Sequence, residues 1–294
     1  MLINESSLGA IHTNFDMSFN RGRMLARPMW GELATEVPST SKTNQYNHLG
    51  PWPKIREWLG DRIVHKLAAH GYSIANKKFE TAIAIDVDDL EDDQIGMYGT
   101  VFEGYGNAVS LFPDELLAAL IASGITAGTG LCYDGQNFMD TDHPVGSSVV
   151  SNYATGAQAL WLLLDLSKPL KPFIVQMRKR FTMVQLNQPN DQNVFFEDKV
   201  IYGTKGRMNV GFGFWQQAYG SKETLDATAY NAAYAAMMAF TDDEGRNLGI
   251  RPTHLLHGPT NRANALDVLM AERLTSGATN VNRGTALPLL VPWM

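Results

Sequence analysis

The stretch Glu91–Ser123, EDDQIGMYGTVFEGYGNAVSLFPDELLAALIAS, decides the fold class of this 294-residue chain. Its apolar side chains recur alternately three and four residues apart, which is the spacing of one helix face. At ~1.5 Å per residue this pattern predicts a helical rod of roughly 50 Å. Gly124 is placed to end the rod, and the acids of residues 86–93 precede it, where they suit the positive end of a helix dipole. The stripe consists of Ile95, Tyr98, Phe102, Tyr105, Val109, Phe112 and Leu116.

Proline and glycine weaken this predicted helix. Pro113 lacks a backbone donor, so we expect a kink after Phe112, with Asp114 and Glu115 as first-turn acids of the second half. Glycines at positions 96, 99, 104 and 106 lower the helix propensity further. An isolated helix of this composition would be poor, so we expect its apolar stripe to pack against other parts of the protein.

The segments before the rod read as two appendages. Residues 1–45 predict an extended arm with a short helix around residues 10–25, and residues 46–85 predict a projection that starts with a Gly-Pro-Trp-Pro turn and ends in an alternating strand. Between Lys54 and Glu80 lie six basic and three acidic residues, followed by six acids in residues 86–93. These blocks could pair within one chain, pair between copies, or form two solvated faces.

The rest of the chain mixes strand and helix patterns, so the fold class is α+β. Strand character is found at residues 171–186, 193–215 and 252–258, and helical character at 224–240 and 260–274. The terminal run TALPLLVPWM places Pro288 and Pro292 in an expected strand, so its pairing should be short or at a sheet edge.

Composition narrows the function. Charged residues make up 18% of the chain, below a usual ~25%, which favours extensive subunit interfaces over a monomer with a polar but uncharged surface. A net charge of −6 and a pI near 5.6 argue against a protein that grips phosphate backbones, so any contact with nucleic acid should be weak and unspecific. With a single cysteine, no secretory signal and no apolar run near ~20 residues, we expect a soluble cytosolic protein without disulfides.

The stretch Leu131–Pro144, LCYDGQNFMDTDHP, is the main candidate for chemistry. Asp134-Gly135 favours a two-residue hairpin, and the remaining acids are turn formers. The alternative is a metal-dependent hydrolase that uses Asp140, Asp142 and His143, but a second histidine at helical spacing and an EF-hand pattern are both missing. Phosphate-binding glycine loops, a nucleophile elbow and HExxH are also absent. We therefore expect no catalytic, cofactor-binding or metal-ligating residues and no enzyme activity.

Several long segments in a fixed order resemble the major head subunit of Mu-like phages and prophages. They are ATEVPSTSKTNQYNHLG (34–50), REWLGDR (56–62), GYSIANKKFE (71–80), DDLEDDQIGMY (88–98), LCYDGQNFMDTDHPVG (131–146) and GFGFWQQAYGS (211–221).

The resemblance implies the Hong Kong 97-type fold of tailed-phage capsids. Its parts would be an N-terminal arm (1–45), an E-loop extension (46–85), a peripheral domain (86–151) with a spine helix (91–123), an axial domain (152–258) and a return to the peripheral domain (259–294). Because the chain shows no long N-terminal delivery segment, scaffold and protease are expected to be separate proteins.

The implied function is self-assembly into pentamers and hexamers of an icosahedral head around double-stranded DNA. Portal, scaffold or protease and decoration proteins would be partners, a membrane would not, and assembly would take place in the bacterial cytoplasm. Since tryptophan and arginine dominate buried interface anchors, Trp52, Arg56, Trp58 and Arg62 are the predicted inter-subunit residues. The two tryptophans could instead be buried in their own subunit, and a nanocompartment shell with the same fold is the alternative function.

Overall fold

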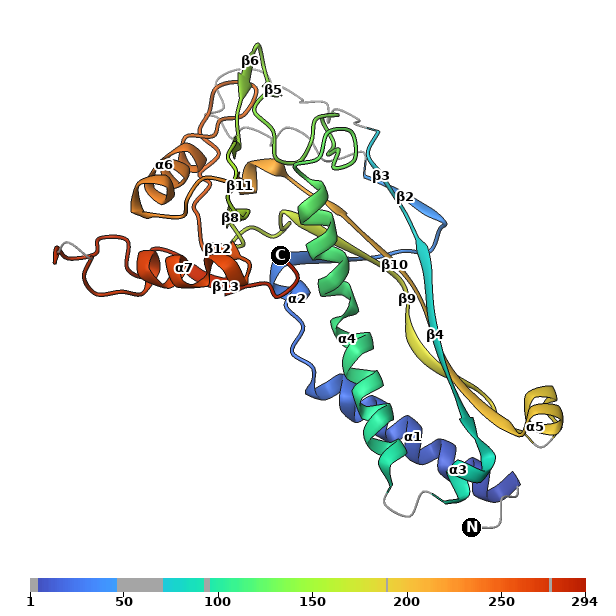
Figure 1. The fold of residues 1–294 in the computed structure, drawn as a ribbon. Helices are drawn as coiled ribbons and strands as arrows, with labels where there is room; N and C mark the ends of the chain where they lie inside the picture. Colours follow the sequence, from blue (N-terminus) through green and yellow to red (C-terminus); the bar gives the residue numbers. More distant parts are fainter. Residues whose placement is uncertain (1–4, 47–70, 93–95, 189, 275–276) are drawn as a thin grey trace.

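The computed structural model describes residues 5–46, 71–92, 96–188, 190–274 and 277–294. The molecule is elongated, with a long shaft of helices and strands and a broader lobe at one end (Figure 1). The N-terminus lies at the far end of the shaft, whereas the C-terminus lies in the lobe. Among the described helices, none has the length and apolar character required to cross a membrane.

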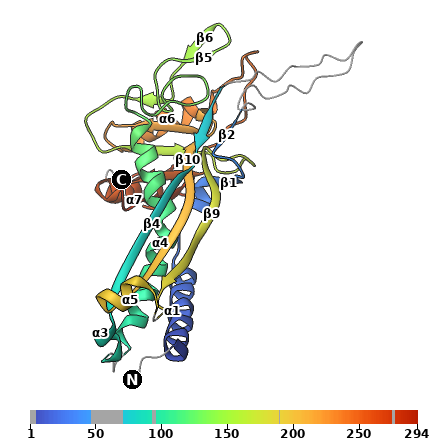
Figure 2. The same cartoon turned by 90° about the vertical axis from the view of Figure 1, so that its right-hand side faces the viewer.

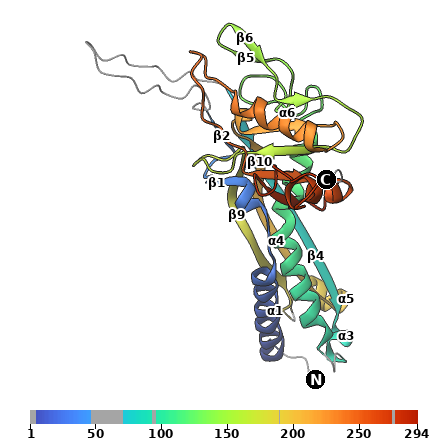
Figure 3. The same cartoon turned by 90° about the vertical axis from the view of Figure 1, so that its left-hand side faces the viewer.

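Two helices run along the shaft. The first, α1 (Glu5–Leu25), packs against α4 (Met97–Ser123), and both lie on the same side of the shaft's strands (Figure 3). At Gly106 the backbones approach so closely that an added Cβ would lie 1.9 Å from the carbonyl oxygen of Phe19. A glycine that weakens the isolated helix is therefore what allows the two helices to touch.

The shaft sheet has four strands in the order β1-β9-β10-β4. Strands β9 (Phe173–Leu186) and β10 (Lys199–Phe212) form a long antiparallel hairpin, β4 (Lys77–Asp86) pairs antiparallel with β10, and β1 (Ala34–Pro38) runs parallel to β9. Helix α5 (Gln192–Glu197) forms the tip of the hairpin, and the short α3 (Val87–Glu91) follows β4.

Aromatic rings join the helices to this sheet. Phe102 of α4 is fully buried, stacks on Phe15 of α1 with ring centroids 4.2 Å apart, and meets Tyr202 of β10 edge-on at 5.1 Å. Higher on the shaft, Phe112 contacts Phe79 and Phe181 in the same edge-to-face manner. The predicted apolar stripe is thus the face of α4 that packs on α1 and the strands.

The lobe is built on a five-stranded sheet in the order β13-β12-β8-β11-β7. Its central strand β8 (Trp161–Leu164) is completely buried, and α6 (Ala227–Met238) and α7 (Arg262–Leu269) pack against the neighbouring strands. The remaining lobe strands are β7 (Tyr153–Ala154), β11 (Ala218–Ser221), β12 (His254–His257) and β13 (Leu287–Leu290). Strand β13 is short and at the sheet edge, as its prolines predict.

Smaller elements complete the described chain. A four-residue helix α2 (Trp30–Leu33) links α1 to β1. Two small antiparallel sheets are formed by β2 (Thr43–Gln45) with β3 (Ser73–Ala75), and by β5 (His143–Val145) with β6 (Ser148–Val150). Short 3-10 helices occupy Trp215–Gln217 and Pro259–Asn261.

Two predictions about the long helix are corrected, and one stays a prediction. It begins at Met97 rather than Glu91, because Asp86 accepts a hydrogen bond from the Asp88 amide and caps the separate helix α3. It is continuous through Pro113, and the predicted kink after Phe112 stays a prediction. Asp114 does not serve a new first turn; its buried carboxylate accepts hydrogen bonds from the amides of Met29 and Trp30 instead.

Two further boundaries differ from the sequence pattern. Residues 192–197 form helix α5 instead of strand, because Asn193 donates hydrogen bonds to the carbonyls of Leu186 and Lys199 and so closes the chain between the two strands. Helix α7 ends at Leu269, earlier than the predicted residue 274. The predicted strands at 171–186 and 252–258 and the helix at 224–240 are present with slightly shorter bounds.

Candidate functional site

The predicted inter-subunit anchors Trp52, Arg56, Trp58 and Arg62 lie in residues 47–70, outside the described residues. Their role therefore stays a prediction. After the short strand β3, strand β4 runs down the shaft beside β10 (Figure 2).

The loop that follows α4 leads from the shaft into the lobe. A tight turn occupies Asp134-Gly135, where Gly135 has a φ of +84° and its amide donates to the carbonyl of Cys132. Strand pairing around the turn is limited to one bridge between Leu131 and Asn137, so the predicted hairpin is only a turn.

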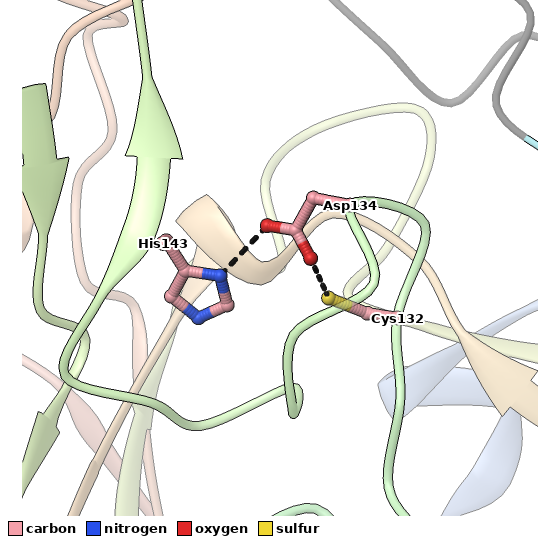
Figure 4. A group of neighbouring side chains, drawn as sticks. All are labelled: Cys132, Asp134 and His143. Atoms are coloured by element: carbon pink, nitrogen blue, oxygen red, sulfur yellow. Dashed lines mark hydrogen bonds and ion pairs between the residues drawn. The ribbon is translucent and has the colours of Figure 1, made fainter. Parts of the chain in front are cut away.

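Three side chains of this loop meet in the interior: Cys132, Asp134 and His143 (Figure 4). One Asp134 carboxylate oxygen accepts from Nδ1 of His143 at 2.8 Å, and the other accepts from the Cys132 thiol at 2.9 Å. The side chain of His143 is fully buried and that of Asp134 is 6% exposed. The imidazole ring stacks on Trp215, with ring centroids 4.0 Å apart.

Asn152 fixes the other side of this histidine. Its side-chain amide donates to the carbonyl oxygen of Phe138 at 2.8 Å, so its Oδ1 must be the atom that faces Nε2 of His143 at 3.2 Å. That oxygen only accepts, and the Asp134 carboxylate on the other side of the ring only accepts as well. The His143 ring is therefore held between two acceptors, and the cluster is a buried histidine–carboxylate pair.

The charges of the cluster suit a structural role. Although burial raises it, the pKa of Asp134 is held below its ordinary value by hydrogen bonds from His143 and Cys132. Burial, reinforced by the charge of Asp134, raises the pKa of the Cys132 thiol, so the thiol stays protonated. A protonated thiol is a poor metal ligand, and the Asp134 carboxylate already accepts two hydrogen bonds.

The proposed metallohydrolase triad is not assembled. His143 turns both nitrogens toward Asp134 and Asn152, while Asp142 is exposed and Asp140 accepts from the amides of Asn137 and Thr141. The predicted structural role for these acids thus holds for Asp134 and Asp140.

Two members of the cluster were missed by sequence reasoning. Asn152 lies eight residues after the Leu131–Pro144 stretch and Trp215 lies in the segment GFGFWQQAYGS, and no local pattern places either beside His143. A second acidic group, Asp86, Asp88 and Asp198, gathers at the far end of the shaft, where α3 meets the end of α5. Its members are exposed or half-buried, and Asp86 already caps α3.

The fold matches a known viral shell subunit over nearly its whole length. A chain from the procapsid of bacteriophage JBD30 superposes with a TM-score of 0.88 at 40% identity, covering 99% of this chain and 100% of that one. The protein therefore has the Hong Kong 97-type fold of tailed-phage capsids, and it is a shell-forming subunit.

Sequence relatives make the family specific. The chain is 39% identical to the Mu-like prophage FluMu major head subunit of Haemophilus influenzae over 275 residues, covering 90% of this chain and 88% of the relative. It is 34% identical to the major capsid protein of Escherichia phage Mu, covering 96% and 95% of the two chains. Residues 8–294 match the family model of the Mu-like prophage major head subunit gpT, and the chain belongs to this family.

The protein is thus a major capsid protein of Mu-like phage type, a component of the virion that assembles into a multimeric shell. Its relatives are structural proteins rather than enzymes, in agreement with the absence of enzyme activity predicted from the sequence. These comparisons do not favour the nanocompartment shell or the hydrolase.

Proposed function

We propose that this subunit forms pentamers and hexamers, which close into an icosahedral head around double-stranded DNA. The observation that carries the proposal is the whole-length likeness to a phage procapsid chain, because shaft and lobe then keep the shape that they have in a shell. The net charge of −6 suits a wall that tolerates DNA through counterions without binding it tightly.

The regions of the chain take the following roles in this proposal. Residues 1–45 are the N-terminal arm, 46–85 the E-loop extension, 86–151 the peripheral domain, 152–258 the axial domain and 259–294 the return to the peripheral domain. Cyclic contacts of the axial domain make each capsomer, since head-to-tail interfaces close into rings.

The extension supplies the anchors between subunits within a capsomer. Trp52, Arg56, Trp58 and Arg62 offer the aromatic and guanidinium groups that dominate buried interface hot spots. Portal, scaffold or protease and decoration proteins are the further partners, and assembly takes place in the cytoplasm of the bacterial host.

One experiment tests the assembly and its anchors together. Purified wild-type protein should give closed heads in negative-stain electron microscopy, and full heads should contain nucleic acid rather than a protein cargo. Deletion of residues 50–62 should leave soluble monomers or capsomers. Intact heads after that deletion would remove the extension from the mechanism, and protein-filled particles would point to a nanocompartment.

A further inference from the structure

Within the described residues, the half of the shaft sheet nearest the tip is uncovered on one face, which Figure 2 shows with α5 at the tip. Helices α1 and α4 cover the other face, and farther from the tip β3 lies over the sheet, with Ile74 against Gly211 of β10. Near the tip, Val184 is 54% and Leu186 52% exposed. An apolar strand face uncovered to this extent is typical of a binding surface.

The open face has a hollow of about 550 Å³. Its floor is Gly203 of the middle strand, which pairs with Val184 on one side and Ala82 on the other. In the next row Ile201 lies between Leu186 and Ala84. Small residues in the centre and branched apolar ones beside them leave room for a bulky side chain.

A matching knob lies at the tip of the same shaft. Phe195 and Phe196 of α5 are 71% and 74% exposed, and their rings contact each other edge-on at 5.0 Å. Two adjacent phenylalanines at this exposure are an unfavourable solvent surface unless another molecule covers them.

Charge determines which surface the knob can meet. Around the phenylalanines, residues 191–198 contain Asp191, Glu197 and Asp198 and no base. Of the charged residues, Lys205 and Glu80 line the hollow, and toward the middle of the shaft the same strands expose three further lysines, Lys77, Lys78 and Lys179. An acidic tip is therefore attracted to this lysine-bearing part of the strands and repelled by another tip.

We propose that Phe195 and Phe196 of one subunit dock into the hollow around Gly203 of a second copy of this chain. The contact joins two different patches, so it is head-to-tail, and the tips of several subunits can close it into a ring. This contact rests on the proposed function. Both patches lie at the end of the molecule far from the lobe (Figure 1), so in a head the contact joins subunits of different capsomers.

The first test removes the knob. The double variant Phe195→Ser/Phe196→Ser should fold and form capsomers, yet the yield of closed heads should fall at least about tenfold, as expected when an aromatic hot spot is lost. Met24→Ser/Leu25→Ser is the matched control, because these adjacent residues of α1 are 86% and 60% exposed and lie outside both patches. Unchanged head yield in the knob variant, or loss of capsomers as well, would overturn the proposal.

The second test identifies the partner surface by disulfide formation. Subunits with Phe196→Cys are co-assembled with subunits carrying Leu186→Cys, and the heads are mildly oxidised. Native Cys132 is buried with a raised pKa and gives no background. Cross-linked dimers should form in the mixture and not with either variant alone. Dimers of Phe196→Cys alone would show tip-to-tip contact and overturn the hollow as the partner, as would heads without any dimer.

A third test uses charge. Glu197→Lys or Lys205→Glu alone should reduce head yield, whereas both changes together should restore much of it, and Glu272→Lys with Lys222→Glu in the lobe serves as control. Absence of rescue contradicts the pairing of the tip with the hollow. If the wild-type chain itself forms no heads, the proposed function fails. If the wild-type chain forms heads and these variants form them equally well, only the tip contact fails.

Discussion

The lobe and the shaft bury their strands differently. All four residues of β8, Trp161–Leu164, are inaccessible to solvent, so both faces of the central lobe strand are covered by the chain itself. In the half of the shaft nearest the tip, β9 alternates between buried residues such as Phe181 and exposed ones such as Val184. The lobe is a completed core, whereas this half of the shaft sheet is covered on one face. A shell subunit can therefore be stable alone and still offer a surface that only assembly covers.

The largest predicted effect breaks the lobe at its buried His143–Asp134 pair. Asp134→Asn removes the carboxylate that accepts from His143 and from the Cys132 thiol, and removing one partner of a buried pair costs about 3–5 kcal/mol. Urea unfolding of the unassembled subunit measures the loss. Asp142→Asn, an exposed acid eight residues further on, is the control and should leave stability nearly unchanged. Equal stability of the two variants would mean that the Asp134 carboxylate does not stabilise the lobe.

In the shaft, we expect the largest loss of stability from a substitution where α1 crosses α4. Gly106→Ala would place a Cβ 1.9 Å from the carbonyl oxygen of Phe19, so α1 must move away from α4. Overpacking of this kind costs about 1–3 kcal/mol. Gly104→Ala in the same helix meets nothing within 4 Å and should stabilise by roughly 0.5–1 kcal/mol through helix propensity.

The opposite signs of the two glycine variants are the decisive result. They would be read from thermal unfolding of both proteins under the same conditions. Two stabilising substitutions would show that α1 does not rest on α4 at Gly106, and the shaft would then depend on its aromatic rings alone.

These glycines show where sequence reasoning ends. The helical spacing of the apolar residues predicted α4, because a helix that packs on one face repeats its apolar residues every turn regardless of what covers that face. The same reasoning treated Gly106 as a weakness, since the meaning of a missing Cβ depends on α1, eighty and more residues earlier in the chain. Acids at 86–93 were assigned to the wrong helix for a similar reason: a cap depends on local backbone geometry that charge alone does not reveal.

The buried cluster could be predicted only in part. The turn around Asp134-Gly135 follows from local propensity, and the expectation that this stretch binds no metal stays a prediction. The partners that hold the His143 ring, Asn152 and Trp215, come from other elements of the lobe. In the same way, Phe195 and Phe196 favour a strand by composition. They lie in a helical tip because Asn193 donates hydrogen bonds to the carbonyls of Leu186 and Lys199, which joins the ends of the two strands.

A smaller effect than that of either substitution is the loss of lobe stability at low pH. The pKa of Asp134 is lower in the folded protein than in the unfolded chain, where it is about 3.9. The stabilisation is therefore fully present above the unfolded-state pKa and is lost as the pH falls through the folded-state value. The stability difference between wild type and Asp134→Asn should shrink as the pH falls below about 3.9. A difference that grows with acid would reverse the assigned sign.

The smallest effect is expected at the ion pair between Arg21 of α1 and Glu103 of α4. It spans the same helix crossing as Gly106, but the arginine side chain is 63% exposed. Exposed pairs contribute about 0.2–1 kcal/mol and are screened by salt, so Glu103→Gln should cost less than about 0.5 kcal/mol at 0.5 M salt. Chemical unfolding at low and high salt measures this. A loss as large as that of Gly106→Ala would mean that charge holds the helices together, whereas a small one leaves close backbone contact as the force that shapes the shaft.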